Sequence, residues 1–120
     1  MNNVIFYTDK DGRSEIQEYL VTLQQRNDKD SRIKSNKIIA YINMLKKYGL
    51  QIGQPYIKRL NDEIWELRPL RDRILFAYYE NNTFILLNVF VKQTQKTPKK
   101  EIKKAEKLLM DFKKRSDNYG

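Results

Sequence analysis

The most informative feature of this 120-residue chain is what it lacks, because it has no cysteine and no histidine. Without cysteine, disulfide bonds and thiolate chemistry are excluded. Without histidine, the chain has neither the usual acid–base group at neutral pH nor the commonest metal ligand. Any catalysis therefore depends on Lys, Arg, Tyr, Asp or Glu, or on a group supplied by a partner.

Long hydrophobic runs and a secretion signal are also missing. No apolar segment approaches the ~20 residues of a membrane-spanning helix, and the first residues, MNNVIFYTDKDG, lack the pattern of a signal peptide. The chain shows no internal repeat, low-complexity tract or interdomain linker, and its length suits one domain. We therefore expect residues 1–120 to form a single cytoplasmic domain with no membrane partner.

What the chain has in excess is positive charge. Lysine and arginine number 24 against 15 aspartates and glutamates, which gives a formal charge of +9. That imbalance favours a polyanionic partner such as nucleic acid, an anionic membrane surface or an acidic protein. A basic domain without such a partner is the alternative.

The N-terminal part predicts one strand and two helices. Residues 3–8, NVIFYT, are β-branched or aromatic and are followed by a DKDG turn. Ser14 with Gln17 is typical of a helix start, and a second helix is expected from about Ser31 to a stop at Gly49. Each helix carries an apolar stripe. The stripes are Ile16, Tyr19, Leu20 and Leu23, then Ile33, Ile38, Tyr41, Ile42, Leu45 and Tyr48.

The remainder predicts strands joined by short turns and then a helix. Strands are expected at residues 56–60, 64–68, 73–80 and 83–92. Asn81 and Asn82 suit a two-residue hairpin turn because asparagine tolerates positive φ. Thr97 as N-cap with Pro98 at the first helical position starts the last helix. We predict an α+β fold, in which an antiparallel β-meander packs with two N-terminal helices and a C-terminal helix.

The expected hairpin registers divide the sheet into two faces. A four-residue turn sets Arg68 opposite Arg73, and a two-residue turn sets Glu80 opposite Thr83. One face is then apolar or aromatic throughout and is the expected core, formed by Trp65, Leu67, Ile74, Phe76, Tyr78, Ile85, Leu87, Val89 and Val91. The other face, apolar at its far end, carries Glu66, Arg68, Arg73, Leu75, Ala77, Tyr79, Phe84, Leu86, Asn88, Phe90 and Lys92.

The polar end of the second face gathers like charges. Arg68 and Arg73 oppose each other across a hairpin, which destabilises a sheet unless something relieves the repulsion. A bound anion, with Lys92 beside the two arginines, is one interpretation. The other is a structural ion network in which Glu66 neutralises one of the arginines.

Further basic residues surround this cluster. The preceding strand adds either Lys58 or Arg59, depending on a loop length that the sequence leaves open. Arg71 lies in the turn and is expected to face solvent. In the final helix every residue from Lys99 to Lys104 except Ile102 is charged. This run is either a solvated surface or a guide for RNA.

Three stretches of this sequence together resemble a known toxin family. They are L-x-x-x-x-W-E-L-R from Leu60 to Arg68, R-I-x-x-x-Y from Arg73 to Tyr78, and F-x-K-x-T-Q-K-T-P-x-x-E-I-x-x-A from Phe90 to Ala105. The combination is similar to the phage-derived HigB-like branch of the RelE/HigB/ParE toxin superfamily. The resemblance covers residues from about 56 to 112.

The resemblance implies a RelE-like fold and a type II toxin. Such toxins cleave mRNA, usually within the ribosomal A site, and are neutralised by a cognate antitoxin that often binds DNA through a HigA-like helix-turn-helix. Cleavage in this superfamily needs no metal or cofactor, because the RNA 2′-hydroxyl attacks the adjacent phosphate and leaves a 2′,3′-cyclic phosphate or a 3′-phosphate.

The resemblance also implies roles for particular residues. Arg68, Arg73 and Lys92 match basic positions of the family and are expected to contact the scissile phosphate, with Glu66 or Lys92 as candidates for proton transfer. The expected RNA-binding residues are Lys58, Arg59, Arg71, Phe90, Lys96, Lys99 and Lys100. Phe90 either stacks on a base or is a packing residue.

The sequence departs from the family pattern in two respects. It has no histidine, and no tyrosine closes the last strand. The general base is therefore not identified, and the ribosome is expected to help by orienting the substrate. The competing hypothesis is a non-catalytic protein with the same fold, either a ParE-like gyrase inhibitor or a nucleic-acid binder without cleavage activity.

Overall fold

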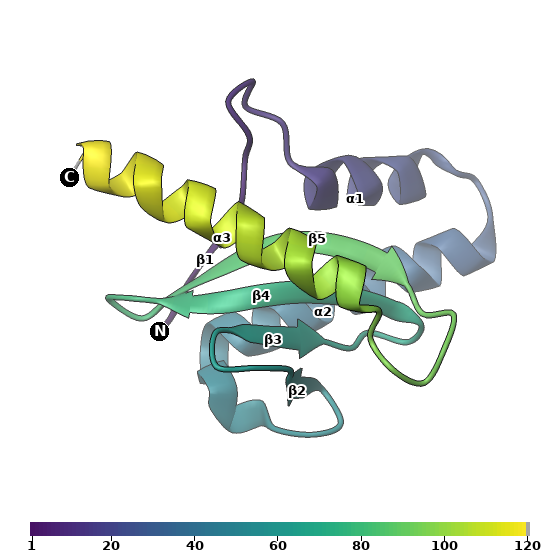
Figure 1. Ribbon diagram of the computed structural model, residues 1–120. Helices are drawn as coiled ribbons and strands as arrows, with labels where there is room; N and C mark the ends of the chain where they lie inside the picture. Colours follow the sequence, from purple (N-terminus) through teal and green to yellow (C-terminus); the bar gives the residue numbers. More distant parts are fainter. Residues whose placement is uncertain (120) are drawn as a thin grey trace.

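The computed structural model describes residues 1–119, which fold as helices on both faces of one sheet. Helices α1 and α2 cover one face and α3 crosses the other (Figure 1). Within the described residues, the elements in chain order are β1 (Asn3–Phe6), α1 (Glu15–Gln25), α2 (Lys29–Tyr48), the short 3₁₀ helix η1 (Gly49–Ile52), β2 (Ile57–Arg59), β3 (Ile64–Leu67), β4 (Asp72–Tyr79), β5 (Thr83–Val91) and α3 (Lys99–Tyr119). The predicted α+β class is confirmed.

The sheet consists of the predicted meander and one additional edge strand. Among the described residues the strand order is β1-β5-β4-β3-β2, and every neighbouring pair from β2 to β5 is antiparallel. Strand β1 lies parallel to β5, with Asn3 opposite Thr83. The sequence predicted strand β1 but not its position in the sheet.

The helix boundaries follow their capping residues. Ser14 Oγ accepts a hydrogen bond from the Gln17 amide, as predicted for the N-terminus of α1. Helix α2 begins before the predicted Ser31, because Asp28 is its N-cap. The Asp28 carboxylate accepts from both the amide and the hydroxyl of Ser31, each at 2.9 Å. Gly49 ends α2 at a φ of 64°, as its position predicted.

The β4–β5 hairpin differs from the predicted register near its turn. Tyr79, not Glu80, pairs with Thr83, so the loop has three residues, and Asn81 and Asn82 both take positive φ. A register shift at Leu75/Phe76 then restores the predicted pairing, and Arg73 lies opposite Phe90. The longer loop and the bulge compensate each other, a combination that alternation of side chains does not reveal.

This local shift reverses the faces of four residues between the turn and the bulge. Phe84 and Leu86 join the core under α1 and α2, whereas Ile85 and Leu87 face α3. The prediction for these four residues was therefore wrong. Other predicted core residues, among them Trp65, Leu67, Ile74 and Phe76, do lie against α1 and α2.

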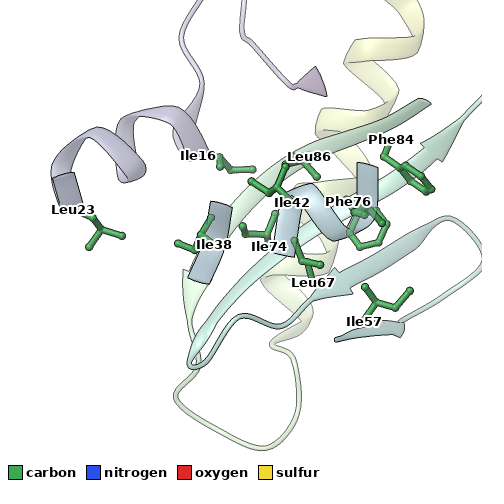
Figure 2. Close-up of a cluster of buried hydrophobic side chains, with 11 residues drawn as sticks. Ile16, Leu23, Ile38, Ile42, Ile57, Leu67, Ile74, Phe76, Phe84 and Leu86 are labelled. Atoms are coloured by element: carbon green, nitrogen blue, oxygen red, sulfur yellow. The ribbon is translucent and has the colours of Figure 1, made fainter. Parts of the chain in front are cut away.

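Two hydrophobic clusters hold the layers together. In the first, Ile16 and Leu23 of α1 and Ile38 and Ile42 of α2 meet buried residues of the sheet (Figure 2). In the second, Ala105 and Leu109 of α3 pack on the other face. Tyr78 and Val91, predicted as core, are 49% and 36% exposed because each lies near the C-terminal end of its strand, at the margin of the sheet. No described helix combines the length and apolarity needed to cross a bilayer.

Candidate functional site

The charged residues selected from the sequence meet at one end of the sheet, where β3 and β5 end and β4 begins (Figure 1). Backbone hydrogen bonds hold this end together. The Arg68 amide donates to the Tyr56 carbonyl, the Asp72 amide to the Pro69 carbonyl, and the Lys92 amide to the Arg71 carbonyl. These contacts bring Arg68, the turn and Lys92 to the same end of the sheet.

Glu66 lies at the centre of the charged cluster and is only 3% exposed. Its Oε2 atom is 3.6 Å from Arg68 Nε and 4.0 Å from Arg73 Nε. Its Oε1 atom accepts a 2.5 Å hydrogen bond from the Thr97 hydroxyl. The predicted convergence of the two arginines therefore occurs, and a carboxylate lies between them as in the predicted ion network.

Arg73 is buried in this arrangement. Its side chain is 8% exposed, and its Nη1 atom donates to the carbonyls of Leu70 at 2.8 Å and Asp72 at 2.9 Å. Burial lowers the pKa of Arg73, and the neighbouring Glu66 carboxylate partly offsets that effect. The Arg73 guanidinium thus fixes the β3–β4 turn, and protein atoms cover the route to it.

Arg68 is the more accessible of the two arginines. Its side chain is 27% exposed. Arg68 Nε is buried without a hydrogen-bond partner among the described residues. The 3.6 Å separation from Glu66 is too long for a hydrogen bond, so the carboxylate attracts Arg68 without saturating its donors.

The segment from β5 to α3 covers Glu66 and Arg73. Together with these two residues, it lines a small cavity of about 10 Å³, enough for about one water molecule. Thr97 was predicted to cap the last helix, but its hydroxyl donates to Glu66 and α3 begins at Lys99. A phosphodiester therefore reaches Glu66 or Arg73 only if this covering segment, residues 93–97, moves.

The sequence left open whether Lys58 or Arg59 joins the charged cluster, and the β2–β3 register decides between them. Lys58 pairs with Glu66 and is exposed, so it joins the face of the charged cluster. Arg59 pairs with Trp65 on the other face. Arg59 lies 5.9 Å from the Trp65 ring and donates to the carbonyls of Asn61 and Asp62, which keeps it apart from Glu66.

The remaining predicted residues are spread around the cavity. Lys92 is half-buried and Lys96 is exposed, and both line the cavity. Phe90 also lines it, but it packs against the α3 side of the core, in keeping with the packing alternative. Arg71 is exposed and donates a 2.9 Å hydrogen bond to the Lys92 carbonyl.

The lysines of α3 divide into two groups. Lys99, Lys100 and Lys103 are exposed, and none of them makes an ion pair within the described residues. Lys104 and Lys113 are instead paired with Glu15 and Glu63 at 2.5 and 2.6 Å. Lys99, Lys100 and Lys103 extend the positive charge from Lys96 along the start of the helix, and Lys107 and Lys114 are further exposed lysines without an ion pair within the described residues.

A second buried carboxylate was missed by the sequence analysis. Asp72 is fully buried, accepts a 2.6 Å hydrogen bond from the Tyr19 hydroxyl, and lies 3.5 Å from Lys34 Nζ. Burial raises the pKa of Tyr19, and the hydrogen bond to Asp72 raises it further. Nothing local in the sequence links residues 19, 34 and 72, so only the tertiary structure reveals this contact. Over residues 1–119, no group of three or more Asp, Glu, His or Cys side chains is arranged to hold a metal ion.

The meander with helices on both faces is of the RelE-like α+β class. Residues 10–110 match the family model described as "Phage derived protein Gp49-like (DUF891)". The match covers most of the sequence, and the chain therefore belongs to this family, which is part of the RelE/HigB-type toxin superfamily. No curated protein matches the chain. Membership implies a toxin-like protein with an antitoxin partner.

Proposed function

We propose that this protein is an mRNA interferase of the HigB-like branch, a toxin that cleaves mRNA on the ribosome and is neutralised by a helix-turn-helix antitoxin. The carrying observation is the gathering of Arg68, Arg73 and Lys92 around the carboxylate of Glu66. The positive charge exceeds what that carboxylate neutralises, and Arg68 and Lys92, which carry the surplus, are partly exposed. A phosphodiester carries the negative charge that complements this surplus.

The proposed reaction is an internal transfer within the RNA. The 2′-oxygen forms a bond to phosphorus, the bond from phosphorus to the 5′-oxygen breaks, and a 2′,3′-cyclic phosphate and a 5′-hydroxyl result. Arg68 and Lys92 stabilise the charge that develops on the phosphoryl oxygens. Glu66 accepts the proton of the 2′-hydroxyl, and Lys92 donates a proton to the leaving 5′-oxygen.

Two of these roles depend on movement of the covering segment. Glu66 is hydrogen-bonded to Thr97 and covered by the segment that carries Thr97, so RNA reaches its carboxylate only after this segment moves. Arg73 holds the β3–β4 turn and lies beside Glu66, and it acts on the phosphate only once uncovered. Arg68 and Lys92 need a smaller change because both are already partly exposed.

The direct test is cleavage of a defined mRNA on translating ribosomes, read by mapping the new 5′ ends and by detecting cyclic phosphate at the 3′ ends. Arg68→Ala and Lys92→Ala are each expected to slow cleavage by about 10²–10³-fold, the typical cost of losing one group that stabilises transition-state charge. Arg26→Ala is the control, because Arg26 is exposed at the end of α1. Unchanged cleavage in both variants contradicts the proposal.

The lysines of α3 give a second test. Replacing Lys99, Lys100 and Lys103 with glutamine is expected to weaken RNA binding about equally for all sequences and to flatten its dependence on salt. Lys113→Gln is the matched control on the same helix, because its charge is already paired with Glu63. Equal effects per charge removed show that overall charge, and not this group, controls RNA binding.

A non-catalytic toxin with the same fold is the second candidate. It is favoured by the burial of Glu66 and Arg73, whose polar atoms contact the protein itself. This candidate predicts growth arrest on induction with intact mRNA, and a ParE-like member additionally inhibits DNA supercoiling by gyrase. Growth arrest with new mRNA 5′ ends that disappear in Arg68→Ala supports the interferase instead.

A further inference from the structure

An exposed aliphatic hollow lies on the α2 side of the β3–β4 turn. Three of its side chains come from α2, the turn and the end of β5, and Ile33, Leu70 and Val91 are 43%, 47% and 36% exposed. The hollow has a volume of about 350 Å³ and is completed by Asp30, Lys34 and Arg71. We call this hollow the Leu70 pocket.

Leu70 is placed here against its own conformational preference. Its φ is 58°, in the left-handed region where glycine and asparagine are favoured and a bulky side chain is uncommon. Its side chain is nearly half exposed, so core packing does not explain a leucine at this position. A residue whose side chain is unfavourable at this φ and is not needed in the core points to a role outside folding.

The lining favours protein over RNA. The lining side chains identified among the described residues are aliphatic or charged, and they include no aromatic ring on which a base could stack. Lys34 is already paired with the buried Asp72 carboxylate. Arg71 supplies the available positive charge, because within the described residues its side chain is hydrogen-bonded to a neutral carbonyl and makes no ion pair.

We propose that the Leu70 pocket binds an acidic amphipathic segment of a protein partner. One aliphatic side chain of that segment enters between Ile33, Leu70 and Val91, and a carboxylate beside it faces Arg71. Contact between apolar groups at the centre and opposite charges at the rim is the usual composition of a protein interface. That the segment belongs to the antitoxin rests on the proposed toxin function.

The pocket is joined to the charged cluster through the backbone. The Leu70 carbonyl accepts the 2.8 Å hydrogen bond from Arg73, and Arg71 donates to the Lys92 carbonyl. A partner that binds Leu70 and Arg71 therefore contacts two residues that are hydrogen-bonded to Arg73 and Lys92. Binding in the Leu70 pocket is expected to alter RNA affinity, because of these hydrogen bonds and because Arg71 is itself an expected RNA-binding residue.

The test uses the full chain labelled with ¹⁵N and a synthetic peptide, and it follows amide chemical shifts, which detect even weak binding. The probe is an acetylated nonapeptide with leucines at positions 3 and 7 and glutamate elsewhere. In an α-helix, with ~3.6 residues per turn, this spacing puts both leucines on one face. We expect shifts at residues 33–34, 70–71 and 91. Peptides with serine in place of leucine, or glutamine in place of glutamate, are expected to bind about tenfold more weakly.

Variants of the chain test the same contact without endangering the fold. Leu70→Asn removes the apolar side chain and suits the positive φ better, and Val91→Thr keeps the shape of a β-branched residue. Each is expected to weaken peptide binding by about fivefold to tenfold. Val21→Thr is the control, because Val21 is exposed on α1 and does not line the pocket.

Several outcomes overturn the proposal. These are shifts confined to the charged cluster or α3, no shifts at all, equal binding by the three peptides, or displacement of the pocket signals by a single-stranded hexauridylate instead of the peptide. The assay contains no ribosome and measures no cleavage. Peptide binding with inactive RNA cleavage therefore contradicts only the proposed function, and cleavage without peptide binding contradicts only this inference.

Discussion

Replacing Arg73 with alanine is expected to destabilise the fold far more than replacing Arg68. Arg73→Ala removes the two hydrogen bonds to the carbonyls of Leu70 and Asp72, and it leaves buried Glu66 with one fewer positive neighbour. Breaking a buried ion pair costs about 3–5 kcal/mol. Because Glu66 keeps Arg68 and the Thr97 hydroxyl, we expect a loss near the lower end, about 3 kcal/mol.

The companion change, Arg68→Ala, is expected to cost less than about 1 kcal/mol. The Arg68 side chain is 27% exposed, and its contact with Glu66, at 3.6 Å, is longer than a hydrogen bond. Solvent screening therefore weakens the attraction. Arg73→Lys, which keeps the charge but loses the shape of the guanidinium, is expected to fall between the two alanine variants.

Urea unfolding followed by tryptophan fluorescence measures the difference. Trp65 is the only tryptophan of the chain and packs at the edge of the first cluster, so its emission reports global unfolding. With a urea dependence of about 2 kcal/mol per M, the midpoint for Arg73→Ala should fall by about 1.5 M. Since small domains have about 5–15 kcal/mol of stability, this variant should remain folded in buffer.

The structural role assigned to Arg73 is refuted if Arg73→Ala loses less than about 1 kcal/mol, or if Arg68→Ala loses more than Arg73→Ala. The result also decides how RNA assays are interpreted. Lost cleavage in an Arg73 variant has two explanations, which are instability of the fold and loss of a group that acts on the RNA. Variants of Arg68 and Lys92 separate these explanations, because both residues are partly exposed.

Three further predictions follow from the buried contacts and one helix cap. Tyr19→Phe is expected to cost about 2 kcal/mol, because it removes the hydrogen bond to the buried Asp72 carboxylate; an unchanged urea midpoint contradicts this. Thr97→Val is expected to accelerate hydrogen exchange across residues 93–97, because Glu66 then no longer holds the covering segment; exchange as slow as in the original chain argues against that role. Hydrogen bonds from Ser31 hold the pKa of the Asp28 carboxyl below its usual value, and the bond from the Ser31 amide contributes more than the bond from its hydroxyl. The stabilisation is therefore present above the unfolded pKa of about 3.9 and is lost as the pH falls through the folded value. A carboxyl titration by NMR should find a lowered midpoint, and Asp28→Ala should remove this part of the acid sensitivity.

The sequence determined the features that depend on neighbouring residues. Ser14 begins the first helix and Gly49 ends the second because a hydroxyl acceptor and a positive φ act within one helical turn. The meander and the convergence of Arg68 and Arg73 on one face follow from short turns and the alternation of side chains. Strand alternation also brought Glu66 to the face of these arginines.

The tertiary structure alone decided which of these residues are accessible and which residues lie beside them. The bulge at Leu75/Phe76 reversed the faces of nearby β5 residues, since alternation carries no information about an inserted residue. Tyr19 meets Asp72 across 53 positions of sequence, and Thr97 meets Glu66 across 31. Such contacts depend on how whole elements pack, and no local pattern encodes that packing. The sequence therefore placed the charges at one end of the sheet, and the packing of the chain buried Arg73 while leaving Arg68 and Lys92 partly exposed.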